Sequence, residues 1–102
     1  MREVTQEQLQ QEFEQGFIVL KWFGAGCGNC KMQEAIIDQI EPTRPDVKFL
    51  KIDVSNAMEL AREYGVTTLP RTSFVKDATI VEAFDGLKPK PIILKKIEEI
   101  FG

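Results

Sequence analysis

The stretch "WFGAGCGNCK", residues 22–31, contains the only two cysteines of this 102-residue chain. Cys27 and Cys30 are separated by two residues and directly follow an apolar run. A pair at this spacing is compatible with a redox-active dithiol, with half of a metal site, or with two small buried side chains. The elements around the pair bear on the choice among these three interpretations.

The cysteine pair occupies a predicted junction between a strand and a helix. The run "FIVLKWF", residues 17–23, is rich in branched and aromatic side chains and predicts a strand that is buried on both faces. From Asn29 or Cys30 onward the apolar period becomes helical, and Pro42 ends the helix. The apolar stripe of this helix is predicted to consist of Met32, Ile36, Ile37 and Ile40.

Three further helices are predicted, over residues 5–16, 55–65 and 89–101. Thr5 and Gln8 form a capping-box pattern at the start of the first, and Asn56 is the expected cap of the second. The last begins near a proline, which suits the first turn of a helix. Its inward-facing residues are predicted to be Ile93, Ile97 and Ile100.

Three further strands are predicted, over residues 47–53, 71–76 and 79–84. The last two are joined by a tight turn at Asp77 and Ala78, and residues 2–4 could add a very short edge strand. A strand–helix–strand step implies a right-handed parallel crossover, whereas the closing pair is an antiparallel hairpin. The expected fold is therefore α/β, with a mixed central sheet of four to five strands flanked by helices on both faces, in a single domain over residues 1–102.

The composition excludes several classes of protein. With 43% hydrophobic and 28% charged residues, the chain is expected to be a globular domain rather than a disordered one. A net charge of −3 and the lack of a basic patch argue against nucleic-acid binding. No apolar run approaches the ~20 residues of a membrane helix, and the N-terminus lacks the apolar core of a signal peptide. We therefore expect a cytoplasmic protein that does not bind membranes, in which a lasting structural disulfide would be unusual.

The position of Cys27 favours thiol–disulfide chemistry. A thiol at a helix N-terminus faces unpaired backbone N–H groups and the positive end of the helix dipole, and both stabilise the thiolate. Cys27 would attack a substrate disulfide and form a mixed disulfide. Cys30, one turn into the helix and more shielded, would then attack Cys27 and release the reduced substrate.

The two other interpretations explain less. A closed zinc site needs about four nitrogen or sulfur ligands, and the chain has two cysteines and no histidine. Two inert buried cysteines could share this spacing by chance, since cysteine packs as a small apolar residue. The glycines around the pair and its place at the strand-to-helix junction favour the redox interpretation, with no metal and no other cofactor.

Over nearly its whole length the chain resembles the thioredoxin family. The resemblance is carried by "FIVLKWFGAGCGNCK", "VKFLKIDVSN", "YGVTTLPRTSFVKD" and "FDGLKPKPIILKKIEEIF". It implies that Pro70 follows a cis peptide bond and sits against the cysteine pair, and that the backbone of Leu69 pairs with the substrate chain. The residue-based alternative for Pro70 is an ordinary turn proline that enters an edge strand.

Several positions depart from the family pattern. Gly26 replaces a tryptophan that usually precedes the first cysteine, which removes an aromatic ring from the substrate-facing rim. The proline often found between the cysteines is absent. Lys21 replaces a buried acid that helps to move the proton of the second cysteine. A buried lysine is costly unless it is paired or neutral, so Lys21 either tunes Cys30, reaches solvent, or pairs with an acid such as Asp53 or Glu34.

Two further basic residues are candidates for electrostatic tuning of the site. Arg71 stands where a small residue is common after the proline, and Lys31 follows Cys30. Arg71 could favour acidic partners, or it could be a solvated strand residue. Lys31 is expected on the exposed face of its helix, with a secondary role.

The sequence therefore predicts a monomeric thiol–disulfide oxidoreductase that reduces protein disulfides. Its partners would be disulfide-containing proteins and an electron donor of the thioredoxin-reductase type. The alternative is a protein-binding module on the same fold, with incidental or no redox turnover. A specialised glutaredoxin-like or oxidase-like role ranks below both, because no glutathione signature can be recognised.

Overall fold

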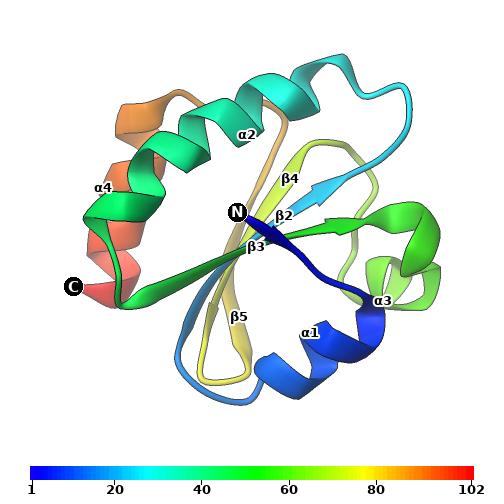
Figure 1. Ribbon diagram of the computed structural model, residues 1–102, viewed down its shortest axis with the longest axis horizontal. Coiled ribbons are helices and arrows are strands. Elements are labelled where there is room, and N and C mark those ends of the chain that lie inside the picture. The colour runs from blue at the N-terminus through cyan, green and yellow to red at the C-terminus, as the bar shows by residue number, and fades with distance from the viewer.

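Five strands form one mixed sheet in the order β1-β3-β2-β4-β5 in the computed structural model, which describes residues 1–102 (Figure 1). The strands are β1 (Arg2–Glu3), β2 (Phe17–Phe23), β3 (Val47–Asp53), β4 (Arg71–Lys76) and β5 (Thr79–Asp85). Strand β2 pairs in parallel with β3 and antiparallel with β4, and β1 adds a short parallel edge to β3. The predicted mixed sheet is confirmed, including its short N-terminal edge strand.

Helices cover both faces of this sheet. They are α1 (Gln6–Glu12), α2 (Gly28–Ile40), α3 (Met58–Glu63) and α4 (Lys90–Phe101), with 3-10 turns at Glu41–Thr43 and Val54–Asn56. Figure 1 shows α2 and α4 on one face, and α1 and α3 on the other. None of the four has the length and apolar character that a membrane crossing requires.

The two faces of β2 contribute to two separate cores. Ile18, Leu20 and Trp22 are fully buried against α1 and α3, as the predicted strand pattern requires. Val19 is fully buried against α2 and α4, in a cluster that also contains Ile37, Ile40, Phe49, Phe74, Ile93, Ile97 and Phe101. Because both faces are covered, the end of β2 is held firmly where the cysteine loop begins.

The predicted capping box of α1 is confirmed. The side chain of Thr5 accepts a hydrogen bond from the Gln8 backbone, and the Gln8 side chain accepts one from the Thr5 N–H. The helix itself is shorter than predicted and ends at Glu12. The β4–β5 hairpin turns as predicted, with Asp77 and Ala78 both at positive φ, as in the two-residue turns that suit twisted antiparallel strands.

The prediction for the start of α3 was wrong. Asn56 does not cap the helix, because Asp53 accepts a hydrogen bond from the Ser55 N–H and draws residues 54–56 into a 3-10 turn. The α-helix begins only after Ala57, without a side-chain cap, and spans residues 58–63. A local side-chain bond to the backbone therefore competes successfully with an earlier helix start.

The predicted apolar stripe of α2 was wrong at its first position. Met32 is 55% exposed, whereas the neighbouring Gln33 is fully buried. The Gln33 amide donates to the carbonyl of Lys88 at 3.2 Å and accepts from the Lys88 N–H at 2.7 Å. This amide thus ties the first turns of α2 to the loop before α4, which turns the helix so that Met32 faces outward.

We expect Gln33→Ala to lower the free energy of unfolding by about 1–2 kcal/mol, because it leaves both backbone groups of Lys88 without their partner. Gln39→Ala is the matched control, since Gln39 is exposed on the same helix. Urea denaturation of both variants measures the difference. Equal stability of the two variants would show that the amide clamp contributes nothing.

Candidate active site

The two cysteines lie where the loop after β2 enters α2. Cys27 is the N-cap residue of the helix, with extended backbone angles and no side-chain capping bond, and Cys30 lies in its first turn. The Cys30 N–H donates to the Cys27 carbonyl at 3.3 Å. Their Cα atoms are 5.4 Å apart, and the two sulfur atoms form a disulfide. The strand-to-helix junction thus brings the pair together as the sequence predicts.

The two sulfur-bearing residues differ in their access to solvent. Cys27 is partly exposed, whereas Cys30 is only 4% exposed. The backbone N–H groups of Gly28 and Asn29, which precede Cys30 in the first turn of α2, have no partner within the helix and lie next to the N-cap residue. Negative charge on a sulfur at this position is therefore stabilised by the helix terminus.

The loop before Cys27 has a backbone that favours glycine. Gly26 has φ +76°, in the left-handed region that side chains with a Cβ rarely adopt, and open space surrounds the place that a Cβ would take. Glycine at position 26 therefore suits both the left-handed backbone and the open rim of the loop.

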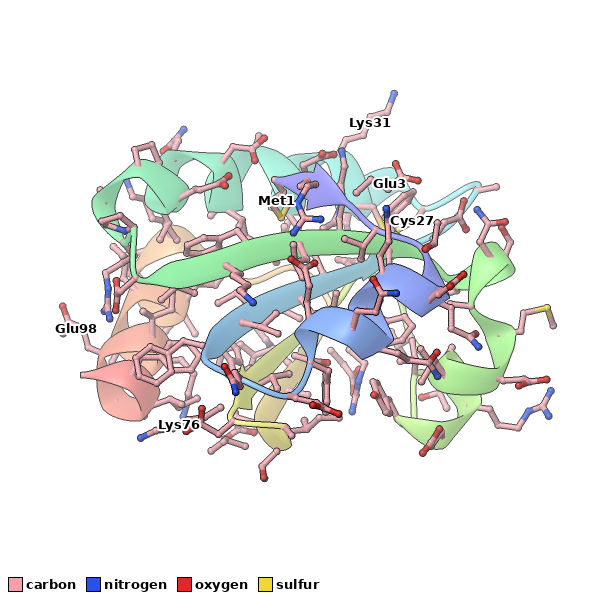
Figure 2. The ribbon with its side chains drawn as sticks, turned by 60° about the horizontal axis from the view of Figure 1, so that its bottom comes forward. Met1, Glu3, Cys27, Lys31, Lys76 and Glu98 are labelled. Atoms are coloured by element: carbon pink, nitrogen blue, oxygen red, sulfur yellow. A yellow bond between two sulfur atoms is a disulfide. The ribbon has the colours of Figure 1, made fainter.

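A cavity of about 640 Å³, which we call the thiol cavity, opens beside the pair. Both cysteines line it, together with Lys21, Phe23, residues 24–26, Gly28, Lys31, Glu34 and Asp53. Lys31 points away from the molecule along the exposed side of α2, as predicted (Figure 2). Lys21, in contrast, is 1% exposed. The suggestion that Lys21 reaches solvent was therefore wrong, and its pairing with an acid is what the structure shows.

The charge of Lys21 is only partly balanced. Its Nζ lies 4.0 Å from Oε2 of Glu34, while Oε1 of the same carboxylate accepts a hydrogen bond from Lys51. Burial lowers the pKa of Lys21, and nearby Lys51 lowers it further, although Glu34 acts in the opposite direction. The hydrogen bond to Glu34 raises the pKa of Lys51. One carboxylate thus serves two ammonium groups, of which Lys51 is the better paired.

A second hollow, of about 420 Å³, also borders Cys27 and is lined by residues 25–29, Thr67 and Leu69. The Leu69–Pro70 peptide bond is cis, as the resemblance implies, and Pro70 is buried. The backbone groups of residues 67–69 make no hydrogen bond within the protein. Gly24 permits this arrangement, since a Cβ there would lie 3.0 Å from Cδ1 of Leu69.

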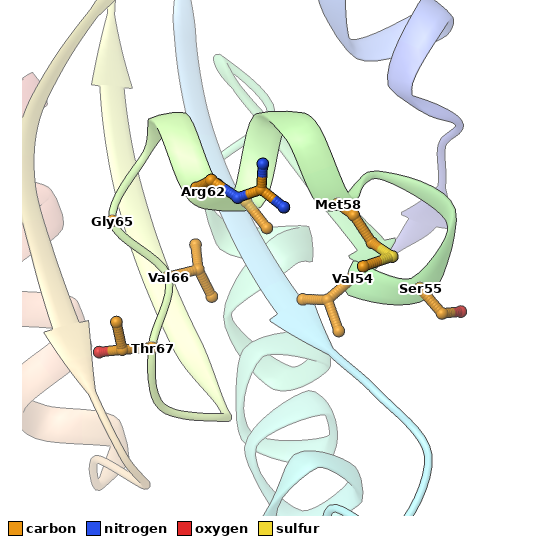
Figure 3. A pocket seen from close by; sticks show the side chains of 8 residues that line it. Val54, Ser55, Met58, Arg62, Gly65, Val66 and Thr67 are labelled. Carbon is orange, nitrogen blue, oxygen red and sulfur yellow. The ribbon is translucent and has the colours of Figure 1, made fainter.

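A third hollow, of about 550 Å³, lies between α3 and the following loop (Figure 3). It is lined by Val54, Ser55, Met58, Ala61, Arg62, Gly65, Val66 and Thr67. Thr67 also lines the hollow beside Cys27, so the two hollows are adjacent. The residue pattern singles out neither Thr67 nor Met58, because only the tertiary fold places Thr67 beside the cysteine loop and α3 beside residues 65–67.

Arg71 lies outside all three hollows. Its guanidinium donates to Asp85 on the neighbouring strand at 2.7 Å, and more weakly to the Tyr64 carbonyl at 3.5 Å. The structure therefore brings Cys27, Cys30, Lys21, Lys31 and Gly26 to the thiol cavity and places Leu69 at the adjacent hollow. It does not place Arg71 with them.

Comparisons with known proteins agree with this geometry. A family model described as Thioredoxin matches residues 1–99. The chain is 30% identical over 96 residues to a thioredoxin of Chlamydia trachomatis, with 94% of each chain covered. It superimposes with a TM-score of 0.83 on a thioredoxin of Fasciola hepatica, at 29% identity over 97% of this chain and 98% of that one. Oxidised mitochondrial thioredoxin 3 of Saccharomyces cerevisiae has the same fold, with a TM-score of 0.88 at 24% identity, over 98% and 95% of the two chains.

We expect Gly26→Ala to destabilise the protein by about 1 kcal/mol, because alanine at a left-handed backbone position is strained. Gly28→Ala is the matched control. Gly28 has no positive φ and no close neighbour, and alanine is the better helix former at the start of α2. Thermal unfolding of both variants should give a lower midpoint for the first only. A Gly26→Ala protein as stable as Gly28→Ala would contradict the left-handed loop.

Proposed function

The chain belongs to the thioredoxin family, whose members are thiol–disulfide oxidoreductases that reduce protein disulfides. We propose the following roles for its residues in that reaction. Cys27 is the nucleophile and Cys30 is the resolving thiol. The observation that carries this assignment is their unequal exposure at one helix N-terminus, since the attacking sulfur must reach a protein substrate and the resolving sulfur need not.

The reaction proceeds in two exchanges. The Cys27 thiolate attacks one sulfur of the substrate disulfide, that S–S bond breaks, and the departing substrate sulfur takes up a proton. The Cys30 thiolate then attacks the Cys27 sulfur, and the second substrate thiol leaves in the same way. Two protein thiols are thereby oxidised to the Cys27–Cys30 disulfide, and the substrate disulfide is reduced to two thiols.

Binding of the substrate chain is assigned to the hollow beside Cys27. The unpaired backbone groups of residues 67–69 can bond an extended segment in the manner of an added strand. Leu69 supplies this backbone, Pro70 shapes the segment, and Gly26 leaves the opposite rim free of a bulky side chain. An extended substrate that continues past Thr67 enters the apolar hollow beside α3 (Figure 3).

The family implies disulfide-containing protein substrates and reductase partners in general. We propose that this chain works as a monomer, with residues 1–102 acting as one domain, in a reducing compartment such as the cytoplasm. It would carry electrons from a thioredoxin-reductase-type donor to its substrates. Membership of the family and the bonded cysteine pair do not favour the alternative of a redox-inactive binding module.

Substitution of the cysteines tests the assignment of their roles. Cys27→Ser should abolish the reduction of insulin disulfides, whereas Cys30→Ser should accumulate a mixed disulfide between Cys27 and the substrate. Non-reducing electrophoresis and intact mass detect that adduct. Full activity of Cys27→Ser would overturn the nucleophile assignment, and a Cys27,Cys30→Ser double variant that still captures the same substrates would revive the binding module.

The hollow beside α3 should favour substrates with an apolar residue near the reactive cysteine. For peptide disulfides that differ only by leucine or serine at such a position, we expect Met58→Gln to cut the preference for leucine about fivefold, equivalent to about 1 kcal/mol of apolar burial. Met32→Gln is the matched control, because Met32 is similarly exposed but lines none of the three hollows. If both variants keep the full preference, the substrate does not use this hollow.

A further inference from the structure

Lys21 breaks the pattern of the strand on which it lies. It occupies the central strand β2, on the same face as Val19, and it is as buried as the apolar residues around it. The long amphipathic side chain of a lysine ordinarily carries its ammonium group to water. Here the ammonium group lies in the interior, 5.3 Å from the ring centre of Phe23, and Lys21 lines the thiol cavity together with Cys30.

The neighbours of Lys21 do not neutralise its charge. Its register partner on β3 is a second lysine, Lys51, and the single carboxylate between them belongs to Glu34 of α2. The Glu34 carboxylate is closer to Lys51 than to Lys21. On β4, the register partner of Lys21 is Thr72, whose buried hydroxyl oxygen has no hydrogen-bond partner. The three groups within ion-pair distance, Lys21, Lys51 and Glu34, therefore carry a formal charge of +1, although the carboxylate of Asp38 also raises the pKa of Lys21 from farther away.

This arrangement costs folding free energy. Burial holds the pKa of Lys21 below its ordinary value, so the unfolded chain binds more protons between the lowered pKa and the ordinary one. The free energy of unfolding consequently rises as the pH increases from the lowered pKa to the ordinary one. At pH values below the lowered pKa, the destabilisation caused by burying the charge is present in full. Residues that weaken a fold in this way are expected at functional positions. The functional site that Lys21 lines is the thiol cavity.

We propose that Lys21 is a positioning residue for the resolving step, a buried cation that stabilises the Cys30 thiolate across the thiol cavity. Glu34, held by Lys51, limits how much of that positive charge acts on the sulfur. Cys30 is thus activated by a cation, not by a carboxylate that accepts its proton. This inference rests on the proposed function, because it concerns the second of the two exchanges.

The step itself balances without any further reactant. The Cys30 thiol loses its proton to solvent, and the resulting thiolate is favoured by the ammonium group of Lys21. Its sulfur forms a bond to the Cys27 sulfur, the bond between Cys27 and the substrate breaks, and the electron pair leaves on the substrate sulfur, which takes up a proton. Lys21 ends the step with the charge that it had at the start.

Other charged groups share this environment and must be considered in any pH profile. Those that face Lys21 or line the same cavity are Lys31, Glu34 and Asp38 of α2 and Lys51 and Asp53 of β3. Thr72, the neighbour on β4, does not titrate. Among these groups Lys21 is the buried cation. Removal of its charge should therefore shift the pKa of Cys30 more than removal of the charge of an exposed lysine does.

Lys21→Met tests the proposal, with Lys21→Arg as the charge-conserving variant and Lys48→Met as the control for a lysine exposed on β3. Methionine fills the same space without a charge, and the replacement of a buried ionic group by an apolar one commonly leaves a protein as stable or more so. The pKa of Cys30, measured from ¹³Cβ-labelled cysteine in the reduced protein, should rise by about one unit in Lys21→Met. It should stay close to its original value in the other two variants.

The rate of the resolving step should change in the same variant. If the pKa of Cys30 is one unit higher, the thiolate fraction at neutral pH is about tenfold smaller. Each remaining thiolate is about threefold more nucleophilic, because nucleophilicity rises with pKa. The rate of the resolving step should therefore fall about threefold. Stopped-flow reaction of the reduced protein with dithiobis(nitrobenzoate) separates the release of the first coloured thiolate, caused by Cys27, from the second, caused by Cys30. Only the second release should slow markedly.

A measurement on the unaltered protein tests the proposal independently of whether any variant folds. Coupling between two ionising groups is reciprocal, so the pKa of Lys21, followed by ¹³Cε-lysine spectra, should be higher in the reduced protein than in the disulfide form. Equal values in the two forms, or a Cys30 pKa unmoved in a folded Lys21→Met protein, would overturn the proposal. Failure of the proposed function is distinct, because the cysteines would then form no reversible disulfide at all.

Discussion

The active site depends on the position of strand β2 in the middle of the sheet. All seven of its residues pair with β3 on one side, six of them pair with β4 on the other, and helices cover both of its faces. A strand held on four sides cannot shift, so the loop that leaves it at Phe23 starts from a fixed point. The same rigidity brings Cys27 to the N-terminus of α2, where backbone N–H groups and the helix dipole favour a thiolate.

The second feature of the site is a conflict between stability and charge. A lysine in the interior of a central strand weakens the fold, and the three-residue cluster of Lys21, Glu34 and Lys51 balances it only in part. An exposed ion pair would contribute little in either direction. If the charge of Lys21 acts on the Cys30 sulfur as proposed, it does so in surroundings less polar than water, where an interaction between charges is stronger. The burial that makes Lys21 costly would then also be the property that makes it effective.

Much of the fold could be predicted from local signals. The apolar run of β2, the capping box at Thr5 and the turn at Asp77 and Ala78 all stand in the structure as the residues indicate. The errors arose where a tertiary or local polar contact overrode the periodicity. The apolar stripe predicted that Met32 is buried, but Gln33 is buried in its stead, because the Gln33 amide bonds the Lys88 backbone. Asp53 likewise delayed the start of α3 by bonding Ser55.

The α/β class was predictable from the residues alone, as were the placement of Cys27 and Cys30 at a strand-to-helix junction and the thiol chemistry that such a junction supports. These follow from side-chain periodicity and from contacts between residues close together in the chain. The folded chain was needed to show that Lys21 is enclosed with Glu34, that Arg71 is bound to Asp85, and that Thr67 lines two hollows. Burial and pairing depend on which residues distant in sequence the folded chain brings together, and no local pattern contains that information.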